Sequence, residues 1–413
     1  MSDDLIAIIG CSILGLMAHG ARRHAWLEWV LRVTICLFLF GELISLMDNP
    51  AAMAESPWGY YILLGTVVSS GLLLIKPGRV LFSYLFTIVN QIIAGRFLVA
   101  AFGRLHEAVP AASTTGKEIR PVESSPSPSP ESGTDSSSPS PATGSPANPD
   151  AVAARTATAV PPSPAAAPLY NKVSFLESFV AERIFVPESI PHMNGLWIYF
   201  TTLAFLLTHM EITGFQMPSI MIPVPVTLDQ LFSYNFLGLI LLAVCGAGIF
   251  VSRKPLEVLR RLGLVKPKLW HVGVGIAGIF MTFAYDWLWS YYTHGQEGLG
   301  YADKLSHYNE GTFIGGASAG AAAGVASATG ICAGFGEEIL IRGALQPVFG
   351  IIPAAFMHGV LHGQFAHAPL LIVQVFGWSA LMGIIRRYTN TSTTIITHVG
   401  FNFVSTFIIA FNP

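Results

Sequence analysis

Residues 336–342 read Gly-Glu-Glu-Ile-Leu-Ile-Arg and follow a long run of apolar and small residues, 311–334. The adjacent carboxylates of Glu337 and Glu338 and the guanidinium of Arg342 thus stand in a segment that otherwise suits the interior of a membrane. A charge at the centre of a membrane helix costs about 2.5–3.5 kcal/mol on insertion scales, so such residues are usually paired or functional. This stretch predicts a membrane helix that carries an ionisable site.

The composition places the whole chain in the membrane class. Of its 413 residues, 52% are hydrophobic and only 11% are charged, whereas soluble domains carry about 25% charged residues. The net charge of −2 gives no support for nucleic acid as a partner. The four cysteines stand singly in apolar runs, which favours buried thiols over a disulfide framework. We expect an integral, multi-pass protein whose main partner is the lipid bilayer.

Eleven apolar runs are long enough, or nearly so, to cross the bilayer. Helices are expected because lipid offers no water to hydrogen-bond exposed backbone groups. The runs are 5–18, 29–47, 58–75, 80–102, 196–210, 236–251, 272–291, 312–333, 348–361, 370–385 and 394–410. The predicted fold class is all-α, a polytopic transmembrane helical bundle.

A change of composition divides the chain. Residues 103–170 are dominated by Ser, Pro, Ala and Thr, and such a stretch cannot bury enough apolar surface to offset its ordering entropy. We predict a disordered Ser/Pro-rich linker there, between an N-terminal transmembrane module, 1–102, and a C-terminal domain, 191–413. Residues 171–190, which lie between the linker and that domain, are predicted to form an amphipathic helix at the membrane surface.

Basic residues indicate the orientation in the membrane. Six lysines and arginines cluster in the segment 253–268, and loops rich in such residues face the cytoplasm. Alternation of the later spans puts Arg342, Arg386 and Arg387 on the same side. The predicted location is the cell (inner) membrane.

The two glutamates are expected to face different directions. Glu338 and Arg342 are four residues apart, so they share one helix face and can form an ion pair. Glu337 comes one residue earlier and projects about 100° away. We expect one carboxylate to be held by the arginine and the other to face a cavity, although the pattern alone is equally typical of a structural ion pair.

Two histidines, His358 and His362, are also four residues apart in an apolar segment. Two histidines at this spacing leave about even odds that both are ordinary core residues. Zinc or another divalent metal could bind the pair together with a glutamate, but the HExxH pattern of many zinc proteases is absent. A metal site is therefore an option and not the main expectation.

A third polar pair, His398 and Asn402, lies four residues apart on the last apolar segment. Both side chains can donate hydrogen bonds, which suits stabilisation of a developing oxyanion. The alternative is a hydrogen bond between helices, worth about 0.6 kcal/mol on average in membranes.

Together the three pairs supply the parts of a hydrolase that attacks with water. In this hypothesis Glu337 and a histidine hold a water, and Glu337 takes its proton. The resulting hydroxide attacks a peptide carbonyl, and His398 and Asn402 stabilise the tetrahedral oxyanion. Neither a serine nor a cysteine nucleophile is needed.

These motifs resemble those of the CPBP family (CAAX proteases and bacteriocin-processing enzymes, or Abi), which includes the type II CAAX prenyl endopeptidases. The family pattern is EExxxR, then FxxxH, then HxxxN or HxxxD, on successive membrane helices. This chain has EExxxR at 337–342 and HxxxN at 398–402, and its basic segment 262–268 is similar to the family's lead-in to the core. The resemblance covers about 262–411.

The resemblance implies an intramembrane endopeptidase that acts on a membrane-associated peptide or protein, of which a lipidated substrate is one option. It implies that Glu337 and His362 activate the water and that His398 and Asn402 stabilise the oxyanion. His358 stands where the family has phenylalanine, and we expect it behind His362. The full set of implied catalytic residues is Glu337, Glu338, Arg342, His362, His398 and Asn402.

A divalent metal such as zinc is not part of the preferred scheme. If the enzyme were metal-dependent, its ligands would come from Glu337, His358, His362 and His398.

Two other functions fit parts of the pattern. One is a non-catalytic membrane scaffold or bacteriocin-immunity-like protein, against which the presence of all six motif residues argues. The other is a proton-coupled transporter that uses the carboxylates and histidines as a relay. Transporters usually show internal repeats, and none is evident between the two halves of this chain.

Overall fold

The structure is a computed structural model, and it describes residues 3–48, 57–93, 185–214, 228–293, 318–362 and 369–411. The predicted all-α fold is confirmed, because every regular element within these ranges is a helix. The elements before the linker are α1 (Asp3–Gly20), α2 (Ala25–Asp48), α4 (Pro57–Leu74) and α5 (Lys76–Ile93). The linker predicted at 103–170 lies outside the described residues, and so does most of the surface helix predicted at 171–190.

The C-terminal part opens with one long helix, α7 (Ile190–Gly214). A second helix combines α8 (Leu228–Gln230), the π-helix η3 (Leu231–Gly238) and α9 (Leu239–Gly246). The short α10 (Pro255–Arg261) and the long α11 (Leu269–Thr293) follow. The remaining elements are α13 (Ala319–Glu338), the π-helix η4 (Ile339–Leu345), α14 (Gln346–Phe349), α15 (Ile351–Leu361), α16 (Pro369–Tyr388) and α17 (Thr391–Phe411).

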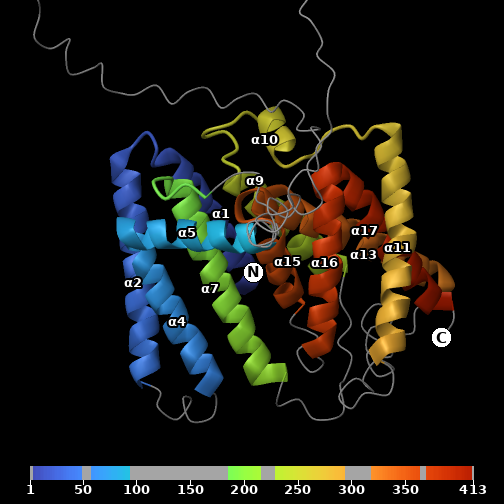
Figure 1. Cartoon of the computed structure of the whole chain (residues 1–413), viewed down its shortest axis with the longest axis horizontal. Coiled ribbons are helices and arrows are strands. Elements are labelled where there is room, and N and C mark those ends of the chain that lie inside the picture. The colour runs from blue at the N-terminus through green and yellow to red at the C-terminus, as the bar shows by residue number, and fades with distance from the viewer. Residues whose placement is uncertain are drawn as a thin grey trace, which may run out of the picture. The chain divides into compact units, whose positions relative to one another are not determined.

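Four helices within the described ranges are long and apolar enough to cross a membrane. They cover Leu228–Gly246, Leu269–Thr293, Ala323–Phe349 and Leu370–Tyr388. A fifth candidate is the pair α4 and α5, which is bent by 114° between its two halves. In Figure 1, α5 accordingly lies across the direction of α2, α4 and α7. These spans make the chain a polytopic, integral membrane protein.

The helices with the three polar motifs pack side by side in the C-terminal part. Helix α13 runs along α17, α15 runs along α16, and α11 packs against α17 (Figure 1). A sharp turn at Gly350 separates α14 from α15. Its φ of 90° lies in the left-handed region that favours glycine, and it lets the chain reverse so that α15 returns beside the glutamate helix.

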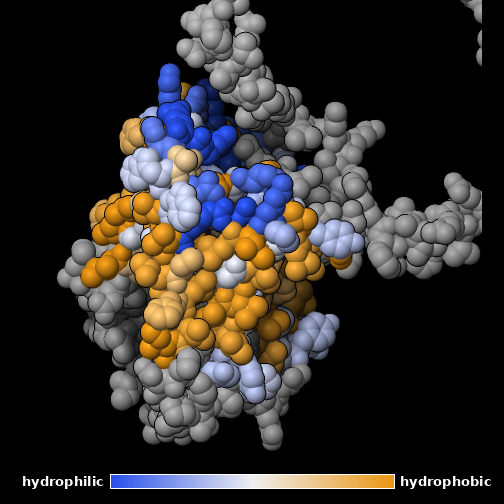
Figure 2. All heavy atoms as spheres, turned by 90° about the vertical axis from the view of Figure 1, so that its left-hand side faces the viewer, coloured by the Kyte–Doolittle hydropathy of each residue, from blue (hydrophilic) through white to orange (hydrophobic). Residues whose placement is uncertain are grey.

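The N-terminal helices pack against the same unit. Helix α4 contacts α7, and α1 contacts α9. Figure 2 shows the face on this side, with an apolar band below a polar cap. Exposed aromatic side chains contribute to the apolar surface of α2 and α4, among them Trp29, Phe40 and Trp58. Such a surface suits lipid contact, since soluble proteins rarely expose contiguous apolar patches of this kind.

Candidate active site

One interrupted helix carries the first motif. Helix α13 ends at Glu338, and the π-helix η4 begins with the next residue and contains Arg342. Short π-helical stretches inside α-helices are rare and frequently occur at functional sites. The change of helix type therefore falls between the two partners of the predicted ion pair.

Close glycine contacts hold this helix against its neighbours. A Cβ atom added at Gly334 would lie 2.6 Å from Val399 Cγ2 and 2.9 Å from the Val399 backbone nitrogen, both on α17. A Cβ atom at Gly336 would collide with the backbone oxygen of Asn235 in η3. These contacts bring the backbone before Glu337 close to α17, on which His398 lies one residue before Val399.

Glu338 lies in a fully buried ionic cluster. Its Oε2 is 3.5 Å from Arg342 Nε, and both side chains have no exposed surface. Its Oε1 is 3.2 Å from His398 Nδ1. A carboxylate can only accept hydrogen bonds, so His398 carries a proton on Nδ1 and donates it to Glu338. Glu338 thereby links the first motif to the third.

Glu337 faces a second group of side chains. Its Oε2 lies 2.7 Å from His358 Nε2 and 3.9 Å from His398 Nε2. The side chain of Glu337 keeps 13% of its surface exposed, whereas His358 is completely buried. Of the two glutamates, Glu337 is therefore the one that a water or a substrate can reach.

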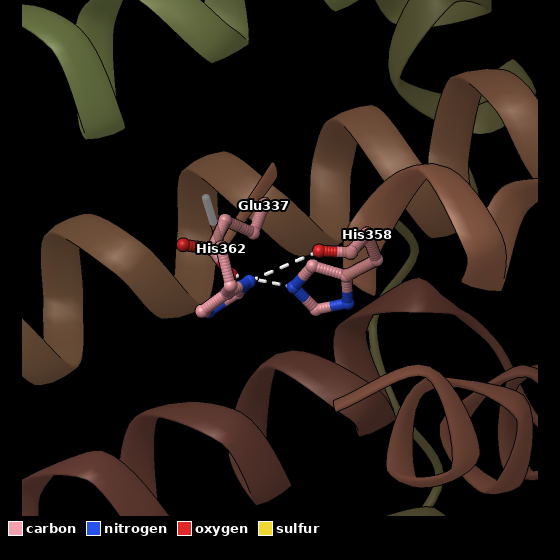
Figure 3. Close-up of side chains that lie close together, drawn as sticks. All are labelled: Glu337, His358 and His362. Atoms are coloured by element: carbon pink, nitrogen blue, oxygen red, sulfur yellow. Dashed lines mark hydrogen bonds and ion pairs between the residues drawn. The ribbon is translucent and has the colours of Figure 1, made fainter. Parts of the chain in front are cut away.

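His362 lies beside this contact. Its Nδ1 is 3.0 Å from the backbone oxygen of His358, which can only accept, so Nδ1 carries a proton and donates it. The two imidazole centroids are 5.1 Å apart. Figure 3 shows the side chains of Glu337, His358 and His362 gathered in one place, with the hydrogen bonds that connect them.

The geometry orders the two histidines differently from the sequence expectation. His358 was expected behind His362, yet it is His358 that makes the direct hydrogen bond to Glu337. The reason is the position of the two histidines along the helix. His358 lies within α15, whereas His362 follows the last residue of that helix. Which histidine is essential for catalysis stays a prediction.

Asn402 lies one helical turn beyond His398 and is partly buried. Among the described residues its side chain makes no hydrogen bond, which distinguishes it from His398. The structure therefore brings Glu337, Glu338, Arg342 and the three histidines together, and it leaves the amide of Asn402 without a protein partner in the described ranges.

Two residues of α16 complete the surroundings, and sequence reasoning did not find them. Ser379 Oγ lies 2.7 Å from Arg342 Nη2 and 3.1 Å from His358 Nδ1. The ring of Trp378 lies 4.8 Å from that of His398 and 5.6 Å from that of His358. No spacing pattern in the sequence marks Ser379 as a neighbour of His358.

Three side chains of the site lie close enough together to hold a metal ion, provided that His358 releases a proton. Donor atoms of Glu337, His358 and His362 lie within 4.8 Å of one another, which small movements could adapt to zinc bonds of about 2.0–2.2 Å. His362 presents a lone pair, and its proton is held by a backbone carbonyl, as is usual for a metal ligand. His358 directs Nε2 at the carboxylate and donates its proton there, so it would have to release this proton before it could ligate a metal. His398 is not part of this cluster.

One known family matches the part of the chain that holds this site. The family model described as Type II CAAX prenyl endopeptidase Rce1-like matches residues 320–404. The matched segment contains all three motifs, and it confirms the resemblance to the CAAX protease family. At the level of the family, the match implies a CAAX-type intramembrane protease. No match was found among curated proteins or among solved structures.

Proposed function

We propose that the chain is an intramembrane endopeptidase in which Glu337 activates a water molecule. The contact that carries the proposal is the one between Glu337 and His358, a short hydrogen bond inside an apolar helical bundle. A buried carboxylate with one partly exposed side is suited to act as a general base. The family match supports the same reaction class.

The two histidines take different parts in this proposal. His358 donates its Nε2 proton to Glu337 and fixes the orientation of the carboxylate. His362 offers the lone pair of Nε2, which can accept a hydrogen bond from the attacking water. Glu337 then removes a proton from that water, and the hydroxide forms a bond to the carbonyl carbon of the substrate.

His398 and Asn402 are proposed to stabilise the oxyanion of the tetrahedral intermediate. His398 can take this role in the form that carries a hydrogen on Nε2 as well as the one that Nδ1 donates to Glu338. In that form Nε2 is a donor, as an oxyanion requires. The amide of Asn402, one turn away on α17, supplies the second donor.

The cycle ends when Glu337 returns its proton. The carbon–nitrogen bond of the intermediate breaks, and the protonated Glu337 gives its proton to the leaving amine. The products are a carboxylic acid and an amine, and the charge of the site is restored. No step is assigned to a metal, because in this scheme the carboxylate of Glu337 and the two histidines activate the water.

The substrate is proposed to be a membrane-associated peptide or protein, because the site lies among helices that can cross the bilayer. A lipidated chain end is one such substrate. The proposed location is the cell (inner) membrane, with the basic segment 253–268 in the cytoplasm.

The test is peptide-bond cleavage by the purified full chain in detergent, with a quenched library of membrane peptides as substrate. Wild type should cleave with and without a strong chelator, and Glu337→Gln should not cleave. Loss of wild-type cleavage with chelator would instead point to a metal at Glu337, His358 and His362. Proton flux in vesicles that stops on Glu337→Gln, without any proteolysis, would favour a transporter.

A further inference from the structure

Three fully buried residues form a directed chain of hydrogen bonds that ends on Glu337. Arg342 Nη2 lies 2.7 Å from Ser379 Oγ, and Ser379 Oγ lies 3.1 Å from His358 Nδ1. His358 Nε2 lies 2.7 Å from Glu337 Oε2. Arg342, Ser379 and His358 have no exposed surface, so water does not compete for these contacts.

The donors and acceptors allow one direction along this chain. A guanidinium has donors only, so Ser379 Oγ accepts from Arg342, and its own hydrogen is free to donate to His358. Arg342 Nη2 also lies 3.4 Å from His358 Nδ1. Two N–H groups that point at each other would repel, so Nδ1 presents its lone pair to Arg342. Both neighbours of Nδ1 are donors, and the neutral imidazole therefore carries its proton on Nε2.

We propose that Ser379 is a positioning residue that sets the tautomer of His358 and, through it, the orientation of the Glu337 carboxylate. This inference rests on the proposed function. In this proposal Ser379 does not contact the substrate, because its hydroxyl is hydrogen-bonded to Arg342 and His358. It also explains why His358 donates to Glu337 and does not offer a metal a lone pair.

The tautomer can be measured without any catalysis. Nitrogen-15 NMR of the histidine-labelled full chain, with His358→Gln for assignment, should show Nδ1 of His358 as the unprotonated nitrogen. Ser379→Ala should mix the two tautomers, whereas Ser379→Thr, which keeps the hydroxyl, should retain the wild-type pattern. A protonated Nδ1 in the wild type, or an unchanged spectrum in Ser379→Ala, would overturn the proposal.

Cleavage kinetics give the second readout. Ser379→Ala should lower kcat about ten- to a hundredfold with little change in KM, as is typical when the partner of a functional histidine is removed. Ser379→Thr should restore most of the rate. Ser327→Ala is the matched control, because Ser327 lies on α13 and bonds only to the Ala323 backbone. Absence of cleavage by wild type would contradict the proposed function, and the NMR result would still decide the tautomer.

An independent observation concerns a cavity between the N-terminal helices and the back of the catalytic helices. Its volume is about 950 Å³, near the upper end of the usual range for ligand pockets, about 300–1,000 Å³. Most lining side chains are apolar, such as Ile8 of α1 and Leu39 of α2. Leu340 and Ala344 of η4 and Met357 of α15 line the opposite wall.

The cations of this cavity gather at one end. His19 and Arg22 lie at the end of α1, and Arg253 and Arg261 flank α10. His19 forms hydrogen bonds with the backbone oxygen of Gly246 and with Ser252 Oγ, next to Arg253 in the same loop. The remaining histidine and carboxylate side chains of the lining are His192 on α7 and Glu42 on α2. Glu42 is 17 residues past the start of α2, about 25 Å along its axis.

Two of these cations are held by backbone carbonyls. Arg261 Nη1 donates to the oxygen of Gly343, 2.9 Å away in η4, and Arg253 donates to the oxygen of Ala247. A carbonyl oxygen fixes the position of a guanidinium group but carries no full negative charge, so the group stays positively charged. The cavity thus combines a long apolar wall with fixed positive charge at one end.

We infer that this cavity binds an anionic phospholipid, with an acyl chain along the apolar wall and the phosphate at Arg22, Arg253 and Arg261. The charge complementarity selects an anionic headgroup over a zwitterionic one. The apolar wall selects a lipid over a free phosphate, because each buried methylene contributes about 0.8 kcal/mol.

Native mass spectrometry of the delipidated full chain tests this site. Phosphatidylglycerol should be retained, phosphatidylcholine retained less, and glycerol phosphate, which lacks the acyl chains, not at all. Arg22→Gln should weaken phosphatidylglycerol retention about fivefold, the effect of one surface cation. Arg23→Gln is the matched control, since Arg23 is equally exposed and does not line the cavity. Equal retention of both lipids, or equal effects of the two variants, would overturn the inference.

Discussion

Two glutamate–arginine pairs with the same sequence spacing have different roles in this molecule. Glu28 and Arg32 on α2 form an ion pair at 2.7 Å, and their side chains keep 32% and 26% of their surface exposed. Glu338 and Arg342 lie 3.5 Å apart, and neither side chain is exposed. The tighter pair is therefore the accessible one, and the looser pair is the buried one.

The neighbours explain this difference. Arg32 also donates to the backbone oxygen of Leu74, so its pair fastens α2 to the end of α4. Arg342 also donates to Ser379, and Glu338 accepts from His398. The buried pair shares its polar atoms with α16 and α17, which loosens the direct contact and builds the site. Spacing alone does not distinguish a structural ion pair from part of an active site.

The largest expected effect is a difference in cleavage rate between a variant in the active site and a variant in the exposed pair of α2. Glu337→Gln should lower kcat by about a hundred- to ten-thousandfold, because general-base catalysis contributes a factor of this size. Glu28→Gln should leave the rate of cleavage unchanged, as its carboxylate accepts hydrogen bonds from Arg32 on the same helix and not from the site. Steady-state kinetics on the same peptide would measure both. Similar losses in the two variants would mean that Glu337 acts through stability and not through chemistry.

The second comparison is one of stability. Arg342→Ala should destabilise the fold by about 3–5 kcal/mol, because it leaves the buried Glu338 without its counter-charge. Arg32→Ala should cost about 1 kcal/mol or less, since partly exposed pairs contribute little. Thermal unfolding in detergent, with ligand-free protein, would report both. Equal unfolding temperatures for the two variants would contradict the importance of burial.

The order of the two histidines gives a third, smaller effect. His358→Ala should reduce cleavage more than His362→Ala, because only His358 donates directly to Glu337 and also meets Ser379. We expect a loss of about a hundredfold or more at His358, and a smaller loss at His362. Measured rates with the reverse order would return the main role to His362, as the sequence motif predicts.

The smallest effect concerns helix packing. Gly334→Ala should destabilise by about 1–3 kcal/mol, since the new methyl group would overlap Val399 on α17. Gly10→Ala on α1 should be neutral or gain up to about 1 kcal/mol, because no atom lies within 4 Å of its added Cβ. The difference in unfolding temperature between each variant and the wild type measures this effect. A stable Gly334→Ala protein would show that α13 and α17 can separate without cost.

The sequence indicates the positions of the polar motifs more reliably than the positions at which the helices make close contacts. Residues 316–324 are all small, a composition that permits close packing between membrane helices. Gly320 and Gly324, however, have no atom within 4 Å of an added Cβ, and the close contacts lie further along the helix, at Gly330, Gly334 and Gly336. Small residues permit close approach, and the position of the neighbouring helix decides where it occurs.

The sequence by itself determined the membrane class, the all-helical fold and the resemblance to the CAAX protease family, because hydropathy, charge content and motif spacing are local properties of the chain. It also determined that Glu338 can reach Arg342, since residues four apart on a helix are neighbours. Only the tertiary structure decided which histidine meets Glu337 and that Ser379 of α16 stands behind it. Those contacts join residues on different helices, and their geometry depends on how the helices pack and on the turn at Gly350, which no local pattern encodes.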